Sequence, residues 1–244
     1  MLYKESFKKF AKNGVDHYYV GTGNPNAPIL IVGKESHISP DDEKGMNDYK
    51  SNAEKWVKRI EENVPDRYEY PVCEKHDLRK GWGKNTWSKY QQLSDIICNV
   101  TSEKFYVNFL HNVFTTEIND SPSRNSVTAN KDSLILRKEL FKKEDFIKQF
   151  PIVVLACSNY IKNEPNNFEI NDIFDVQYDG DKNGKHLYSR GNWFYTHHDN
   201  SDKKLVIHTR QLSSNVDNKM LEDMGIIIRE HLKKLSLSCY VAKS

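Results

Sequence analysis

The chain has 244 residues, 37% of them hydrophobic and 29% charged, with a formal net charge of +2 at pH 7. This length and composition predict a single domain over residues 1–244 and exclude wholesale disorder. No apolar run approaches the ~20 residues that cross a bilayer, and the N-terminal residues lack the apolar stretch of a signal peptide. We therefore expect a monomeric, cytoplasmic protein with no membrane partner.

The four cysteines, Cys73, Cys98, Cys157 and Cys239, are widely spaced along the chain. None of them forms the Cys-x-x-Cys pair that is typical of a zinc or redox site. Reduced structural thiols are the expectation for all four, and no metal site is predicted.

Apolar runs between turn residues predict buried strands, and apolar residues at helical spacing predict amphipathic helices. In chain order we expect a strand at 29–32, helices at 54–62 and 87–98, a strand at 105–114, a helix at 134–150, strands at 152–156 and 205–207, and a helix at 221–235. This alternation favours a parallel sheet covered on both faces. The predicted fold class is α/β, a three-layer αβα sandwich with a central, mainly parallel four-stranded sheet.

Residues 163–203 interrupt the alternation with Asn, Asp, Gly and short aromatic-rich stretches. The simplest interpretation is a hairpin-like insertion with a turn around Asp179–Gly184. Its few apolar residues could not support a separate core, so we expect it to decorate the sheet. Two histidines in this insertion, His197 and His198, are expected at the surface without a chemical role.

The segment at 75–90 interleaves Lys and Arg with aromatic residues. This composition suits phosphate contacts combined with base stacking, but a solvated loop that leads into a helix has the same composition. The residues that we expect to contact DNA from this segment are Arg79, Lys80 and Lys84.

Ligands of open parallel sheets bind outside the carboxyl ends of the strands, so the polar residues there are the first candidates for a site. Glu35 follows the first predicted strand, Asn112 lies near the end of the second, and His208 follows the fourth. Together they offer a carboxylate, an amide and an imidazole.

The first of these strand ends resembles a motif of the uracil-DNA glycosylase superfamily. Residues 23–33, with the sequence GNPNAPILIVG, are similar to the strand that precedes the catalytic carboxylate of that superfamily. The residues that follow place Glu35 where the family carries its catalytic Asp, and His37 where it carries a Tyr.

Two further segments resemble motifs of the same superfamily, and they occur in the same chain order. In FLHNVF, at 109–114, Asn112 matches the Asn that hydrogen-bonds the edge of the pyrimidine. HTRQLS, at 208–213, matches the motif His-Pro-Ser-Pro-Leu-Ser in the spacing of His208, Leu212 and Ser213. The resemblance implies a DNA glycosylase that flips a base out of DNA and hydrolyses its N-glycosidic bond.

Cleavage of this bond builds positive charge on the sugar and negative charge on the departing base. Glu35 would stabilise the sugar and orient or deprotonate a water, and a neutral His208 would donate a hydrogen bond to the base. The resemblance assigns Gly33, His37 and Asn112 to the substrate pocket. It also assigns Leu212 to the space that the flipped base leaves, and Arg210 and Ser213 to the DNA beside it.

The sequence also departs from the superfamily pattern. Lys34 and Ser36 flank the carboxylate in place of Gln and Pro, and a Glu is one methylene longer than an Asp. The smaller ring of His37 could admit a 5-substituted pyrimidine, which makes a modified phage base as good a candidate as uracil. Tyr49 is the candidate for stacking on the base. The Cys spacing of the iron–sulfur branch is missing, so no cofactor is expected.

Ordinary structural roles remain open for each of these residues. Glu35 could cap a helix, Asn112 could satisfy backbone groups, His208 could be a core histidine, and Leu212 a buried leucine. Two other functions stay open as well. The chain could be a catalytically silent nucleic-acid-binding member of the fold, or a hydrolase of free nucleosides.

Overall fold

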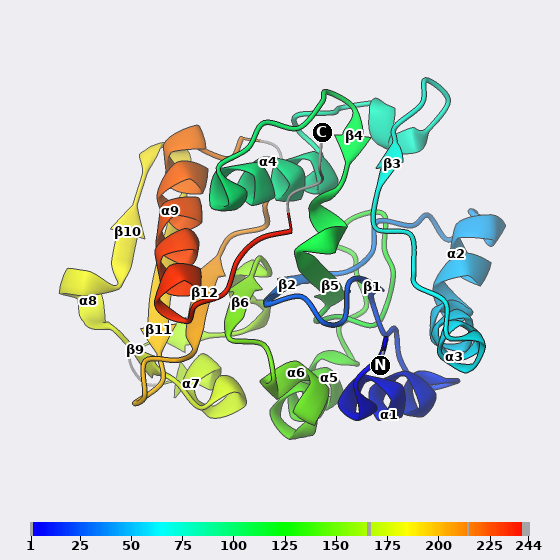
Figure 1. Cartoon of the computed structure of the whole chain (residues 1–244), viewed down its shortest axis with the longest axis horizontal. Coiled ribbons are helices and arrows are strands. Elements are labelled where there is room, and N and C mark those ends of the chain that lie inside the picture. The colour runs from blue at the N-terminus through cyan, green and yellow to red at the C-terminus, as the bar shows by residue number, and fades with distance from the viewer. Residues whose placement is uncertain (1, 165–166, 214, 241–244) are drawn as a thin grey trace.

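The computed structural model describes residues 2–164, 167–213 and 215–240, and a single large sheet forms its centre (Figure 1). The sheet has eight strands, in the order β1-β5-β2-β6-β12-β11-β10, and β9 also pairs with β11. The strands of this sheet are β1 (Thr22–Gly23), β2 (Ile29–Gly33), β5 (Val113–Glu117), β6 (Ile152–Leu155), β9 (Gln177–Tyr178), β10 (Lys185–Leu187), β11 (Trp193–His198) and β12 (Leu205–Thr209).

The central strands β5, β2, β6 and β12 run parallel, whereas β1, β9, β10 and β11 pair antiparallel at the two sides. The α/β class and the mainly parallel centre are confirmed. The predicted number of four strands is wrong, because it included only the parallel centre and missed the four strands that pair antiparallel at the sides.

Helices cover both faces of the sheet (Figure 1). They are α1 (Glu5–Gly14), α2 (Glu43–Lys50), α3 (Asn52–Glu62), α4 (Thr86–Cys98), α5 (Leu134–Lys143), α6 (Asp145–Lys148), α7 (Glu169–Phe174), α8 (Gly180–Asn183) and α9 (Asn218–Lys234). Two small two-stranded antiparallel sheets, β3 (Tyr70–Pro71) with β4 (Tyr106–Val107) and β7 (Asn163–Glu164) with β8 (Asn167–Phe168), lie outside the main sheet.

The side chains of β2 alternate between two hydrophobic clusters, as period-2 geometry requires. Leu30 and Val32 join the cluster that contains residues of α1, α3, α5, α6 and α7. Ile29 and Ile31 join the opposite cluster, which contains residues of α4 and α9. Every residue of β2 is therefore buried, and the three layers of the sandwich are formed by these two helical layers and the sheet between them.

Helices α4 and α9 pack against each other. Gln92, in the middle of α4, contacts Asn218, the first residue of α9, at 3.3 Å, and Asn99, just after α4, contacts Arg229 at 3.4 Å. Helix α9 starts near the end of β12, where Thr209 meets Met220. The beginning of α9 therefore lies on the side of the sheet where the parallel strands end. The end of α4 lies on the other side, because Cys98 contacts Asn112, just before β5, at 3.4 Å.

The predicted strand at 105–114 is wrong. The chain forms β4, a turn of 3-10 helix at Phe109–His111, and then β5 from Val113 to Glu117. The side-chain oxygen of Gln91 accepts the amides of Asn108 and Phe109 at 2.9 and 3.1 Å. These amides bond a helix side chain instead of a neighbouring strand, so the strand begins only after Asn112.

The predicted helix at 134–150 is divided into α5 and α6, because Glu144 takes an extended conformation between them. The helices predicted at 54–62, 87–98 and 221–235 correspond to α3, α4 and α9. Helices α1, α2, α7 and α8 were not predicted.

Residues 163–203 do more than decorate the sheet, because they supply β9, β10 and β11. Between Asp179 and Gly184 the chain forms the short helix α8 instead of the predicted hairpin turn. Strands β10 and β11 form a hairpin whose connection contains Arg190 and Gly191 at positive φ. The sheet therefore gains an antiparallel extension beside β12.

The expectation of four reduced cysteines is wrong for two of them. Cys98, at the end of α4, forms a disulfide with Cys239 in the C-terminal segment. Cys73 is exposed and free, and Cys157 is buried and free. Within the described part of the chain, none of the helices has the length and apolar character needed to cross a membrane.

Candidate functional site

Glu35 lies two residues beyond β2, at the edge where the parallel strands end, and it is buried. The hydroxyl of Tyr160 donates to its Oε2 atom at 2.6 Å, and the Asn119 amide lies 3.4 Å from the same oxygen. The hydroxyl of Ser126 donates to Oε1. All three partners donate hydrogen bonds, which is the environment that an ionised carboxylate needs when it is removed from water.

These three partners come from segments that follow β5 and β6. Asn119 is two residues beyond β5, Ser126 lies in the loop between β5 and α5, and Tyr160 ends the 3-10 turn after β6. Asn119 is itself held, because it donates to the carbonyl of Asn130 at 2.8 Å and accepts from Ser133 at 2.9 Å. The ends of three neighbouring strands therefore fix one carboxylate in place.

A second carboxyl group, Glu117, ends β5 beside this carboxylate. Gly33 pairs with Glu117 across the two strands, and a Cβ at Gly33 would lie 2.2 Å from the Glu117 Oε2 atom. That oxygen is shielded from solvent and has no hydrogen-bond partner among the described residues. Burial, and next the nearby charge of Glu35, raise the pKa of Glu117 to about 8, against the opposing effect of Arg137. Glu117 is therefore mostly protonated at pH 7.

His208 lies in β12 near the same edge, and it is buried. Burial lowers the pKa of His208 to about 4, although its hydrogen bond to the Ser158 carbonyl opposes this shift, so the imidazole is neutral at pH 7. The Nε2 atom lies 2.7 Å from that carbonyl oxygen and so carries the hydrogen. The Nδ1 atom has no partner in the described part of the chain. The Nδ1 atom therefore offers a lone pair, whereas the sequence motifs predicted that His208 donates a hydrogen bond to the base.

The 3-10 turn at Ser158–Tyr160 connects the two expected catalytic residues. Its first residue accepts the hydrogen of His208, and its last residue donates to Glu35. Ser158 has a positive φ of 54°, a conformation that few non-glycine residues adopt. Glu35 and His208 are thus held by the two ends of the same short turn.

Asn112 is not part of this arrangement, because it precedes β5 and lies at the opposite edge of the sheet from Glu117. Its side chain forms two hydrogen bonds with the backbone of Tyr240, one to the carbonyl at 2.9 Å and one from the amide at 2.6 Å. Here Asn112 satisfies backbone groups, which was the structural alternative for this residue, and the structure does not bring it to Glu35.

The expected wedge, Leu212, is fully buried and belongs to the core cluster that contains residues of α4 and α9. An inserted side chain has to reach the DNA stack, so this assignment is corrected: Leu212 is the ordinary buried leucine of the alternative interpretation. Its neighbours Arg210 and Ser213 are partly exposed near the carboxyl edge. No hydrogen bond or ion pair of the Arg210 side chain occurs within the described residues.

The basic segment at 75–90 leads into α4 and includes its first residues, so Lys80 and Lys84 lie before the helix, on the side of the sheet where the parallel strands end. Lys80 and Lys84 are exposed there. The Arg79 guanidinium lies 3.4 Å from the centre of the Phe105 ring and donates to the Val72 carbonyl at 2.9 Å. Two of these residues are thus free for phosphates, whereas Arg79 has a structural role.

The aromatic residues expected to meet a base are occupied by protein contacts. Trp87 packs edge-on against Phe109 at 5.3 Å, and Tyr49 stacks on Tyr19 at 4.5 Å with its hydroxyl on Asp120. His37 is exposed in the loop that carries Glu35, two residues further on. Its position is compatible with the expected contact to a substrate.

One of the two histidines expected at the surface is buried. His197, in β11, is fully buried, and its ring contacts the side chain of Asn163 at 3.0 Å. Burial lowers its pKa to about 4. His198 is partly exposed at the end of the same strand.

Four residues of this site were not predicted from the sequence: Glu117, Asn119, Ser126 and Tyr160. The run Val113–Glu117, rich in β-branched and aromatic residues, carries a strand signal that places Glu117 and Asn119 at a strand end. Ser126 and Tyr160 lie in irregular segments whose position depends on long-range packing, and no local pattern indicates them.

Comparisons with models of known protein families, with curated proteins and with solved structures give no match to this chain. The likeness to the uracil-DNA glycosylase superfamily therefore rests on the sequence motifs alone. Of those motifs, the fold brings the segments around Glu35 and His208 to one edge of the sheet, and it places Asn112 at the other.

Proposed function

We propose that this protein is a DNA glycosylase that hydrolyses the N-glycosidic bond of uracil or of a 5-substituted pyrimidine. The observation that carries the proposal is the pair of carboxyl groups at neighbouring strand ends, Glu35 and Glu117. Glu35 accepts three donors, whereas Glu117 has a raised pKa of about 8. Two carboxyl groups in different environments are the usual arrangement for hydrolysis of a glycosidic bond.

The two carboxyl groups suit different steps of this reaction. Glu35 would stabilise the positive charge that develops on the sugar and orient the attacking water. Glu117, protonated at neutral pH, would supply a hydrogen to the departing base. The sequence motifs had implied this role for His208. The Nδ1 atom of His208, which has no hydrogen-bond partner among the described residues, would instead accept a hydrogen from an amino or imino group of the base.

The loop between β5 and α5 offers a surface for DNA. It carries Arg124, Val127 and Lys131, which are exposed, and its Ser126 donates to Glu35. Val127 is 84% exposed, the highest value among the large hydrophobic residues of the described chain. An apolar side chain between cations suits insertion into a base stack with phosphates on either side, so we assign the wedge to Val127 in place of Leu212.

Two lysine side chains lie close to the ring of Tyr160, whose hydroxyl donates to Glu35. The ammonium groups of Lys34 and Lys131 lie 5.0 and 5.4 Å from the centre of the Tyr160 ring. Lys84 and Arg210 add charge from the segments before α4 and after β12. These cations would attract the phosphates on both sides of a flipped nucleotide.

The shielding of Glu35 favours a second candidate function. Both oxygens of Glu35 are occupied, so the loop at 118–133 has to move before a sugar can reach the carboxylate. If the loop stays closed, the protein binds nucleic acid without cleaving it. This is the catalytically silent alternative.

Incubation with single-stranded and duplex DNA separates these functions. The substrates would carry uracil, 5-hydroxymethyluracil, 5-hydroxymethylcytosine or glucosylated 5-hydroxymethylcytosine, and alkali would reveal abasic sites. Cleavage of one of these DNAs, with loss of activity in Glu35→Gln, supports the glycosylase. Salt-sensitive binding without cleavage of any of them supports the silent binder, and absence of both contradicts the nucleic-acid function altogether.

A further inference from the structure

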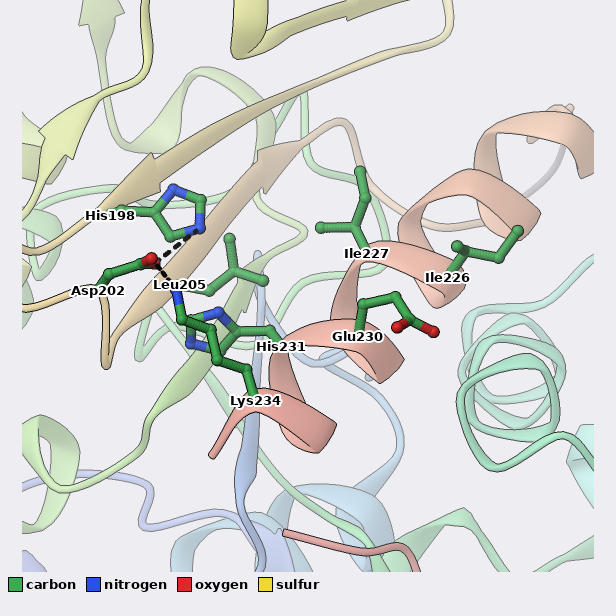
Figure 2. Close-up of a pocket in the computed structure, with 8 residues that line it drawn as sticks. All are labelled: His198, Asp202, Leu205, Ile226, Ile227, Glu230, His231 and Lys234. Carbon is green, nitrogen blue, oxygen red and sulfur yellow. Dashed lines mark ion pairs between the residues drawn. The ribbon is translucent and has the colours of Figure 1, made fainter. Parts of the chain in front are cut away.

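A second group of polar side chains lies at the opposite edge of the sheet, where β11 ends and β12 begins. His198 ends β11, Asp202 lies in the turn that follows, and His231 is in α9. One possible ligand atom from each residue lies within 4.8 Å of the other two. The three side chains line a cavity of about 610 Å³ and face one another in Figure 2.

The ring of His198 is oriented by a carboxylate behind it. Its Nδ1 atom lies 2.8 Å from Oδ2 of Asp179, and the hydroxyl of Thr196 donates to the same oxygen at 2.5 Å. With its hydrogen on Nδ1, the ring presents the lone pair of Nε2 to Asp202, whose Oδ1 atom is 3.9 Å away. A carboxylate that fixes the far nitrogen is the usual support of a metal-binding histidine.

The second imidazole is also held in place. His231 is 5% exposed, its Nε2 atom lies 3.4 Å from the carbonyl oxygen of Lys203, and its ring centre is 5.6 Å from that of His198. With its hydrogen directed to that carbonyl, the ring keeps the lone pair of Nδ1 for a ligand bond.

A cation already occupies the space between these groups. The ammonium group of Lys234, one helical turn after His231, contacts the carboxylate of Asp202 (Figure 2). About half of the Lys234 side chain is exposed, so it can swing into solvent without disturbing the core. The two histidines and Asp202 thus form a place that favours a cation, and the ammonium group of Lys234 can leave it.

We propose that His198, Asp202 and His231 bind a divalent transition-metal ion, for which Zn²⁺ is the best match. Two imidazoles and one carboxylate are a common zinc ligand set, and water completes the tetrahedron. Ligand atoms around such an ion are about 3.3 Å apart, so the 3.9 Å between His198 and Asp202 requires only a small closure. The ion would join β11, the turn and α9, which suits a stabilising role.

Titration of the untagged, EDTA-treated protein with Zn²⁺ in a calorimeter, with melting curves in parallel, tests this site. We expect one ion per chain and a rise in Tm of several degrees at saturation. Asp202→Asn should weaken binding by at least about tenfold, and Asp179→Asn by about tenfold or more. Asn tolerates the positive φ of 53° at position 202, so this variant should fold normally.

Lys234→Met gives the sharpest outcome, because it removes the competing charge and should tighten Zn²⁺ binding. His17→Ala, at an exposed histidine, is the matched control and should leave binding unchanged. The proposal is overturned if the wild type binds no Zn²⁺ in a one-to-one ratio. It is also overturned if Asp202→Asn and His231→Gln both bind like the wild type, or if His17→Ala loses as much affinity as they do.

Discussion

The hydroxyl of Tyr160 donates to the Oε2 atom of Glu35 at 2.6 Å, so a residue after β6 holds the carboxylate that follows β2. Tyr160→Phe removes this donor and leaves a buried acceptor short of one partner. We expect a loss of about 1–3 kcal/mol in the free energy of unfolding, together with slower base release. Urea unfolding and single-turnover kinetics measure the two effects.

Tyr178→Phe is the matched control for Tyr160→Phe, because its hydroxyl donates to the exposed Asp181 at 2.9 Å. This variant should stay within about 0.5 kcal/mol of the wild type. Equal losses in both variants would show that the Tyr160 hydroxyl does not support Glu35.

Glu117→Gln should change how stability depends on pH. The pKa of Glu117 is about 8 in the folded chain and 4.5 for an ordinary Glu, the value expected in the unfolded chain. Between these two pH values the folded state retains a proton that the unfolded state has lost. Its contribution to stability is full below about pH 4.5 and is lost as the pH rises to about 8. Because Gln resembles the protonated acid, the variant should gain Tm relative to the wild type as the pH rises from 5 to 8.

Melting curves at several pH values measure this gain, and Glu139→Gln, at an exposed helix position, is the control. A constant Tm difference between Glu117→Gln and the wild type across this range would contradict the raised pKa. If Glu117 also supplies the hydrogen to the departing base, base release should decline above about pH 8 and should fall in Glu117→Gln.

Val127→Ala and Leu212→Ala should affect different properties. Leu212 is fully buried, so its truncation should cost about 2–5 kcal/mol of stability. Val127 is exposed, so its truncation should change stability by no more than about 0.5 kcal/mol and should slow base release by roughly tenfold through the lost wedge. A stable Leu212→Ala, or a Val127→Ala with wild-type base release, would refute the respective assignment.

Cys239→Ser should loosen the C-terminal segment. The disulfide joins residues separated by 141 positions, and Tyr240 beside it bonds Asn112 and stacks on His111 at 4.3 Å. Loss of such a link typically costs about 2–4 kcal/mol. Urea unfolding with and without reductant measures this cost, and Cys73→Ser, at an exposed free thiol, is the control. Full alkylation of Cys98 in the unreduced, denatured protein would contradict the pairing.

Three of the four parallel strands could be predicted, because β2, β6 and β12 contain short apolar runs flanked by amphipathic helices. Ile29–Gly33 and Leu205–Thr209 are buried along their whole length, so their pattern reflects the sheet directly. The antiparallel extension could not be predicted in the same way. Strands β9 and β10 have two and three residues and take their conformation from pairing with β11.

The candidate site was predictable only where a residue lies at or shortly after the carboxyl end of a correctly placed strand. Glu35 and His208 meet this condition, and both lie at the carboxyl edge. Asn112 does not, because two backbone amides at the start of the 3-10 turn donate to the side chain of Gln91, so β5 starts only after Asn112, which therefore lies at the other edge. Tyr160 could not be found from the sequence, since only the fold brings it to Glu35 over 125 positions.

The central claim is that the carboxylate of Glu35 acts on a glycosidic bond. Single-turnover base release by the wild type and Glu35→Gln, on the DNA that the wild type cleaves, tests it most directly. Gln keeps the size of the side chain and can still accept from Tyr160, so the variant should fold and bind DNA. The account predicts that base release falls by at least ~10²-fold with DNA affinity unchanged. Base release by Glu35→Gln at the wild-type rate would contradict it.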